Sequence, residues 1–95
     1  MRPLLLHDQE LRNQLHQIPL WHSDGKSISK TFKANTFPEA ITWVVAIATQ
    51  AEVVDHHPDI DIRWTTLHIS VTTHDQGGLT QLDIDLATAI DEICK

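Results

Sequence analysis

The chain has 95 residues and a mass of 10.8 kDa, so we expect one domain over residues 1–95. Its single cysteine excludes an internal disulfide and a cysteine-based zinc site. Thirteen acidic against seven basic residues give a net charge of −6, which argues against a nucleic-acid partner. No apolar run reaches the roughly 18 residues of a membrane span, and residues 1–6 are too short for a signal peptide. We therefore expect a cytoplasmic protein without membrane contact.

The first predicted element is a helix over residues 6–18. Leu11, Leu15 and Ile18 fall on one stripe at helical spacing. Asp8 is the expected cap, because a short carboxylate at a helix start accepts a hydrogen bond from a free backbone N–H.

A β-hairpin is predicted next, over residues 21–33. Its turn is Asp24-Gly25, the pair that a two-residue type I′ turn favours because both central positions need positive φ. In the second strand Ile28 and Phe32 share one face, which we expect to be buried.

Residues 36–54 predict the second helix. Thr36 and Glu39 have the spacing of a capping box. The residues at helical spacing that form its expected buried stripe are Phe37, Ile41, Val44, Ala48 and Ala51.

The next residues, 60–74, are predicted to be extended, and 60–64 fit either a separate strand or the bent start of one strand. The side chains expected to face the core are Leu67, Ile69, Val71 and Thr73, whereas His68, Ser70, Thr72 and His74 should line the open face. A last helix follows over residues 80–93, with Thr80 as its cap. This order indicates an α+β domain, with helices packed on one face of an antiparallel sheet.

Histidines and carboxylates gather at two places. Asp55, His56 and His57 directly follow the second helix, which must end here because Pro58 forces the preceding residue out of the α region. His74 lies at a predicted strand end before a glycine loop. Because imidazole has an unperturbed pKa of about 6.5, these residues are candidates for proton transfer near neutral pH. The alternative interpretation is a polar surface turn and a polar strand end.

Asp83 has a structural interpretation as well as a functional one. Thr80 and Asp83 form a capping-box pattern, in which the carboxylate accepts a backbone N–H at the helix start. Dispersed histidines with an aspartate leave a zinc site open as an alternative. The sequence contains neither the serine elbow of a hydrolase nor a phosphate-binding glycine loop.

Taken together, the motifs resemble the pterin-4a-carbinolamine dehydratase family over nearly the whole chain. The most specific part starts with His56-His57-Pro58 and has Thr73-His74-Asp75 with its histidine 17 residues after His57, followed by Gly77-Gly78-Leu79-Thr80 and Asp83. The resemblance implies a four-stranded antiparallel sheet with three helices packed on one face, in the order α-β-β-α-β-β-α. It also implies a homodimer or homotetramer.

The activity that the resemblance implies is removal of water from 4a-hydroxytetrahydropterin, giving quinonoid dihydropterin in tetrahydropterin recycling. No metal or other cofactor is expected. The family's catalytic positions match His56, His57 and His74, and its substrate-binding or supporting positions match Asp55, Pro58, Thr73 and Asp83. The alternative is a non-catalytic relative that acts as a dimeric interaction or assembly factor, or a relative that acts on another pterin, as in molybdopterin metabolism.

Within that resemblance we expect His57 and His74 to flank the C4a hydroxyl. His56 would be a second acid–base group or orient the pterin, Asp55 would set a tautomer, and Asp83 would hold a loop or a histidine.

Two residues depart from the family pattern. Ile60 stands where many members carry a tryptophan that lines the pterin pocket, and Leu82 stands where many carry an arginine. Trp64 is the residue that could supply the missing aromatic surface. The departures bear on pterin stacking and affinity, and they leave the three histidines intact.

Overall fold

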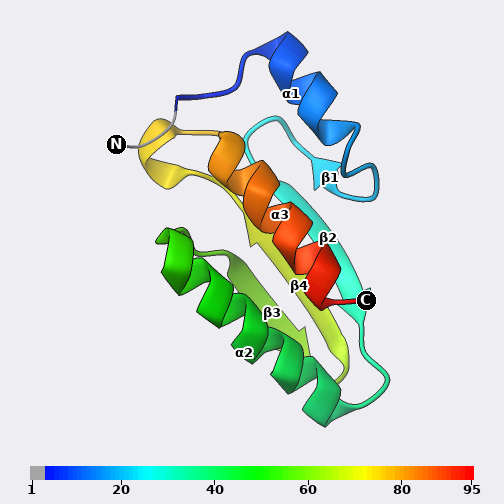
Figure 1. Ribbon diagram of the computed structural model, residues 1–95. Helices are drawn as coiled ribbons and strands as arrows, with labels where there is room; N and C mark the ends of the chain where they lie inside the picture. The colour runs from blue at the N-terminus through cyan, green and yellow to red at the C-terminus, as the bar shows by residue number, and fades with distance from the viewer. Residues whose placement is uncertain (1–3) are drawn as a thin grey trace.

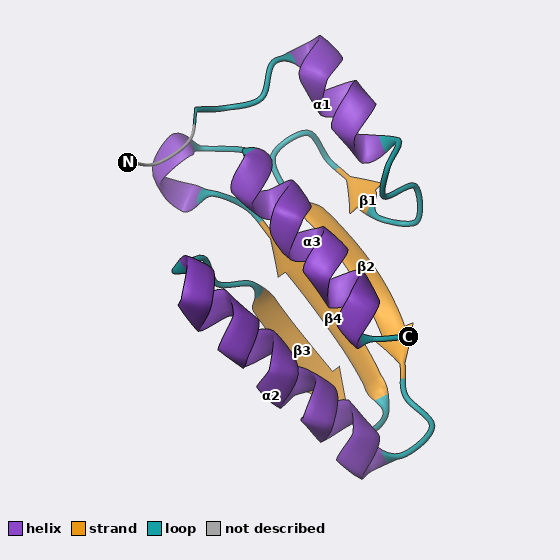
Figure 2. Ribbon diagram, in the orientation of Figure 1, coloured by secondary structure: helices purple, strands orange, loops and turns teal. Residues whose placement is uncertain are grey.

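The computed structural model describes residues 4–95; residues 1–3, which entered the expectation about a signal peptide, lie outside the described residues. It confirms the predicted fold class: three helices and a four-stranded antiparallel sheet follow in the order α-β-β-α-β-β-α (Figures 1 and 2). The elements are α1 (Asp8–Leu15), β1 (His22–Ser23), β2 (Ile28–Lys33), α2 (Phe37–Val54), β3 (Asp59–Arg63), β4 (Thr66–Val71), the 3-10 turn η1 (His74–Gln76) and α3 (Gln81–Ile93).

The sheet has the strand order β1-β2-β4-β3, so that β2 and β4 are its central strands. α2 and α3 lie side by side over one face, while α1 lies beyond the β1 edge (Figure 1). The buried side chains of β4 are Leu67, Ile69 and Val71, and Thr73 continues the same inward alternation. Burying each of these large apolar side chains stabilises the fold by about 1.5–3 kcal/mol.

Hydrogen bonds correct two local predictions near the N-terminus. The cap of α1 is His7 rather than Asp8, because the Glu10 carboxylate accepts the backbone N–H of His7. The β1–β2 turn is a four-residue loop, not a two-residue type I′ turn, since Ser23 pairs with Ile28. Within it only the glycine has positive φ, and the Asp24 carboxylate accepts the N–H groups of residues 26 and 27. Side-chain hydrogen bonding of this kind favours an Asx-type turn over I′ geometry.

The cap of α2 is confirmed, and its predicted buried stripe is right at Val44 and Ala51 and wrong at its other three positions. Thr36 accepts the N–H of Glu39 at the helix start. The residues that face the core are Ala40, Trp43, Ile47 and Ala51, while Phe37, Ile41 and Ala48 of the predicted stripe are exposed. Because α2 is apolar on nearly every side, helical spacing alone does not identify the face that packs on the sheet.

Of the two possibilities left open for residues 60–64, the structure has the separate strand, and the extended run ends earlier than predicted. It divides into β3 and β4, which pair with each other across a turn at Trp64 and Thr65. β4 ends at Val71, and His74 begins η1 instead of continuing the strand. His68 stays on the exposed face of the sheet, where its ring contacts the Thr31 hydroxyl.

Cys94, directly after α3, offers a test of the packing at this end of the sheet. Burial raises the pKa of its thiol to about 11, and the nearby Asp91 carboxylate adds to the shift. At pH 8 the thiolate is then about one part in a thousand of the thiol. We expect slow reaction with a disulfide reagent in the folded protein, rising about tenfold per pH unit. A rate that levels off near pH 9, as in the denatured control, would contradict this packing.

Candidate functional site

The chain after α2 reverses sharply and so brings two consecutive histidines to the site. Asp55 has a φ of 50° at the helix end, and the backbone N–H of His56 bonds back to the carbonyl of Ala51. This pattern satisfies the last carbonyls of the helix. Pro58 then keeps the chain extended as it enters β3.

His56 is buried, with 4% of its surface exposed, and is held by a carboxylate from α3. Its Nε2 lies 2.6 Å from Oδ1 of Asp83, which is itself fully buried. The two residues are 27 positions apart in the sequence, so the contact fastens the end of α2 to the start of α3.

The other oxygen of Asp83 is also occupied. Its Oδ2 accepts the hydroxyl of Thr73 at 2.7 Å and the backbone N–H of Thr80 at 2.9 Å. The predicted capping box is therefore confirmed, and the same carboxylate binds a histidine as well. Both of the interpretations that the sequence left open for Asp83 have a hydrogen bond to support them.

His57 has a different environment from its neighbour. Its Nε2 lies 2.5 Å from Oε2 of Glu52, in the last turn of α2, and their side chains are 54% and 76% exposed. Sequence reasoning assigned no role to Glu52. The available signal was the Ala51-Glu52 pair at the end of the helix, but a spacing of five residues across a helix end does not indicate a contact.

His74 and Asp75 come from the opposite direction, on η1 after β4. Thr73 and Gly78 bridge the base of this loop by backbone hydrogen bonds. Gly77 closes η1 with a φ of 73°, a conformation that favours glycine. The loop therefore holds His74 at a set position relative to the buried Thr73.

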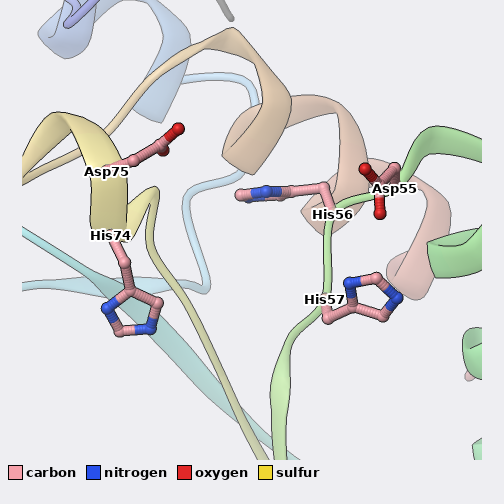
Figure 3. A pocket seen from close by; sticks show the side chains of 5 residues that line it. All are labelled: Asp55, His56, His57, His74 and Asp75. Atoms are coloured by element: carbon pink, nitrogen blue, oxygen red, sulfur yellow. The ribbon is translucent and has the colours of Figure 1, made fainter.

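Together these segments line a cavity of about 290 Å³, formed by Asp55, His56, His57, His74 and Asp75. Figure 3 shows His56 and His57 on one wall, and His74 and Asp75 on the facing wall. The sequence-predicted Thr73, Pro58 and Asp83 are not among the lining residues, and Thr73 and Asp83 support the wall from behind.

The two departures from the family pattern lie outside this lining. Ile60 in β3 is half-buried against the core, and Leu82 lies in the first turn of α3. Trp64 cannot supply an aromatic wall, because it is 75% exposed at the far end of the β3–β4 hairpin. Five residues of strand, about 17 Å, separate it from the pocket.

Residues 4–95 contain neither a membrane-spanning helix nor a ready set of metal ligands. No helix in this part of the chain is long and apolar enough to cross a membrane. Among the same residues, no three histidine, cysteine or acidic side chains are grouped so that they could hold a metal ion.

Comparison with known proteins identifies the family. Residues 4–93 match the family described as pterin 4 alpha carbinolamine dehydratase. The chain belongs to this family. A relative from Roseiflexus sp. (strain RS-1), provisionally named pterin-4-alpha-carbinolamine dehydratase, is 53% identical over 93% of this chain and 95% of its own length. A relative from Nocardia farcinica with the same provisional name is 47% identical over 96% of each chain.

Two solved structures extend the comparison with the dehydratase family. A transcriptional coactivator/pterin dehydratase from Brucella melitensis has a TM-score of 0.89 and 29% identity, covering 96% of this chain and 99% of that one. A pterin dehydratase-like protein identified as a RuBisCO assembly factor has a TM-score of 0.65 and 17% identity, covering 78% and 86%. The second likeness shows the fold alone.

We predict that Asp83→Asn lowers the free energy of unfolding by about 2–4 kcal/mol, because an amide has one accepting oxygen, which cannot face both His56 and the Thr73 and Thr80 donors. The matched control is Asp85→Asn, on the exposed side of the same helix, which should stay within about 0.5 kcal/mol of wild type. Urea unfolding followed by circular dichroism measures both. Equal effects of the two substitutions would show that the buried network does not stabilise the fold.

Proposed function

We propose that this chain is a 4a-hydroxytetrahydropterin dehydratase that works in tetrahydropterin recycling in the cytoplasm. The observation that carries the proposal is the pocket itself: His57 and His74 come from different elements and line one cavity from opposite sides (Figure 3). Membership of the dehydratase family supports the pterin as substrate. The cavity volume suits a small bicyclic ligand, being near the lower end of the roughly 300–1,000 Å³ usual for ligand pockets.

The reaction needs one proton removed and one delivered. The N5 proton leaves to a base, the electron pair of N5 forms the double bond to C4a, and the C4a hydroxyl departs as water after an acid protonates it. No proton is gained or lost overall. Two imidazoles on facing walls suit these two transfers, and a positioned acid–base group typically contributes about 10²–10⁴-fold in rate.

Glu52 supports the acid role of His57 on this proposal. A carboxylate at Nε2 orients the ring and leaves Nδ1 for the substrate. Asp55 lines the same wall and stays our candidate for setting a tautomer. Imidazoles alone supply both proton transfers, so the proposal calls for no metal or other cofactor.

The alternative function is an assembly factor without catalysis, as the name of the more distant structural neighbour illustrates. The three histidines support the dehydratase instead, because a scaffold has no need for imidazoles gathered in one pocket. Another pterin as the natural substrate would use the same proton transfers.

The direct test is rapid-mixing absorbance of 4a-hydroxytetrahydropterin decay. We expect the wild-type chain to accelerate the decay and the double variant His57→Ala, His74→Ala to lose at least about 10²-fold of that acceleration. The control is the double variant His22→Ala, His68→Ala, which removes two histidines outside the pocket and should keep wild-type activity. A wild-type rate equal to the buffer rate, or an unchanged pocket variant, would refute the proposal.

We propose in addition that the outward face of α2 binds a second copy of this chain, forming a homodimer or homotetramer. Phe37, Ile41 and Val45 follow one another on this face at helical spacing, and Val45 is 60% exposed. No residue from 40 to 51 is charged, whereas the chain as a whole carries −6. Copies that repel elsewhere can approach here, and a two-fold axis across α2 makes the face self-complementary.

Val45→Glu should therefore reduce the mass of the assembly in solution, because it places a charge on that face, midway along α2. Sedimentation velocity measures the change. Leu20→Glu is the control, since this leucine is even more exposed than Val45 but lies away from α2. An unchanged mass for Val45→Glu would exclude α2 as the interface.

A further inference from the structure

Two buried hydroxyl groups lie behind the pocket, and the proposed proton transfers make no direct use of either. Thr80 Oγ1 lies 2.8 Å from Thr73 Oγ1, which lies 2.7 Å from Asp83 Oδ2. All three residues are fully buried. Through Asp83, these hydroxyls connect the first turn of α3 with His56, an imidazole that lines the pocket.

Counting hydrogens gives each of these bonds one direction. An ionised carboxylate only accepts, so the single hydroxyl hydrogen of Thr73 is donated to Asp83. Thr73 Oγ1 must then accept in the bond between the two hydroxyls, and Thr80 donates. Thr80 Oγ1 accepts in turn from the backbone N–H of Leu82 at 3.2 Å. Both hydroxyl hydrogens are therefore already donated to an acceptor. Neither threonine has a further proton that it could give to Asp83.

The hydrogen bonds that Asp83 accepts determine which ring nitrogen of His56 carries hydrogen. Asp83 Oδ2 receives the Thr73 hydroxyl and the backbone N–H of Thr80, and its Oδ1 faces His56 Nε2. All partners are satisfied when Asp83 is ionised and Nε2 carries a hydrogen. The two nitrogens of an imidazole point to opposite sides of the ring, so Nδ1 is directed away from Asp83.

We propose that Thr73 and Thr80 are positioning residues that keep the hydrogen of His56 on Nε2 and present Nδ1 to the pocket. On the Asp83 side the imidazole meets only fully buried groups, so a proton taken up at Nδ1 returns on the pocket side. His56 then acts as a one-sided acid–base group beside the more exposed His57. This positioning role adds detail to the proposed dehydratase site. It rests on the proposed function only for the identity of the ligand.

The first experiment uses the wild-type chain with ¹⁵N-labelled histidine. NMR correlation spectra show which ring nitrogen carries hydrogen, and the His56 signals are assigned by their loss in His56→Gln. We expect Nε2, which faces Asp83, to carry the hydrogen of the neutral ring, and Nδ1 to carry none. A hydrogen on Nδ1 with a bare Nε2 would overturn the proposal, whether or not any variant folds.

The second experiment removes one hydroxyl without changing the shape of the side chain. Thr73→Val should broaden His56 into a mixture of tautomers and lower kcat about tenfold, the equivalent of one hydrogen bond to a charged group, with KM little changed. Thr73→Ser should restore both. Thr88→Val, on the outer side of α3, is the matched control and should change neither. A Thr73→Val variant with a single Nε2–H tautomer and wild-type kcat would overturn the positioning role.

These outcomes separate the inference from the proposed function. A wild-type chain that holds the Nε2–H tautomer but does not accelerate pterin dehydration supports the positioning role and refutes the activity. A chain that accelerates pterin dehydration but carries the His56 hydrogen on Nδ1 supports the activity and refutes the positioning role.

Discussion

The carboxylate of Asp83 is the group on which the geometry of the pocket depends. It lies where the end of β4, the start of α3 and the chain after α2 converge, and its two oxygens contact a hydrogen-bonding group of each. A buried donor without an acceptor costs about 1–3 kcal/mol, so all three segments are fastened to one point. Stability and site geometry therefore depend on the same side chain, and a substitution here would disturb both.

Two consecutive histidines lie in different environments because the backbone reverses at Asp55. His56 turns inward to Asp83 and is almost fully buried, whereas His57 stays partly exposed beside Glu52. A rigid imidazole and a more accessible one thus share one wall of the cavity. The facing wall comes from η1, so the pocket forms only when β4 and α2 are both in place.

Local signals in the sequence were enough for much of this structure. The caps at Thr36 and Thr80 and the alternation in β4 predicted the elements, while the resemblance to the dehydratase family predicted most of the residues that line the pocket. The rest depended on tertiary contacts. α2 is apolar on nearly every side, so its buried face is chosen by the sheet and α3. Glu52 reaches His57 only because the helix ends between them, and Trp64 is carried away from the pocket by the direction of β3.

The measurement that tests the central claim most directly is the structure of the chain with a stable dihydropterin bound. The account predicts the pterin in the cavity, with His57 and His74 on opposite sides of C4a and each within about 3–3.5 Å of the reacting atoms. His56 should still be bonded to Asp83. A pterin bound elsewhere, or with both of these histidines on one side of C4a, would contradict the account.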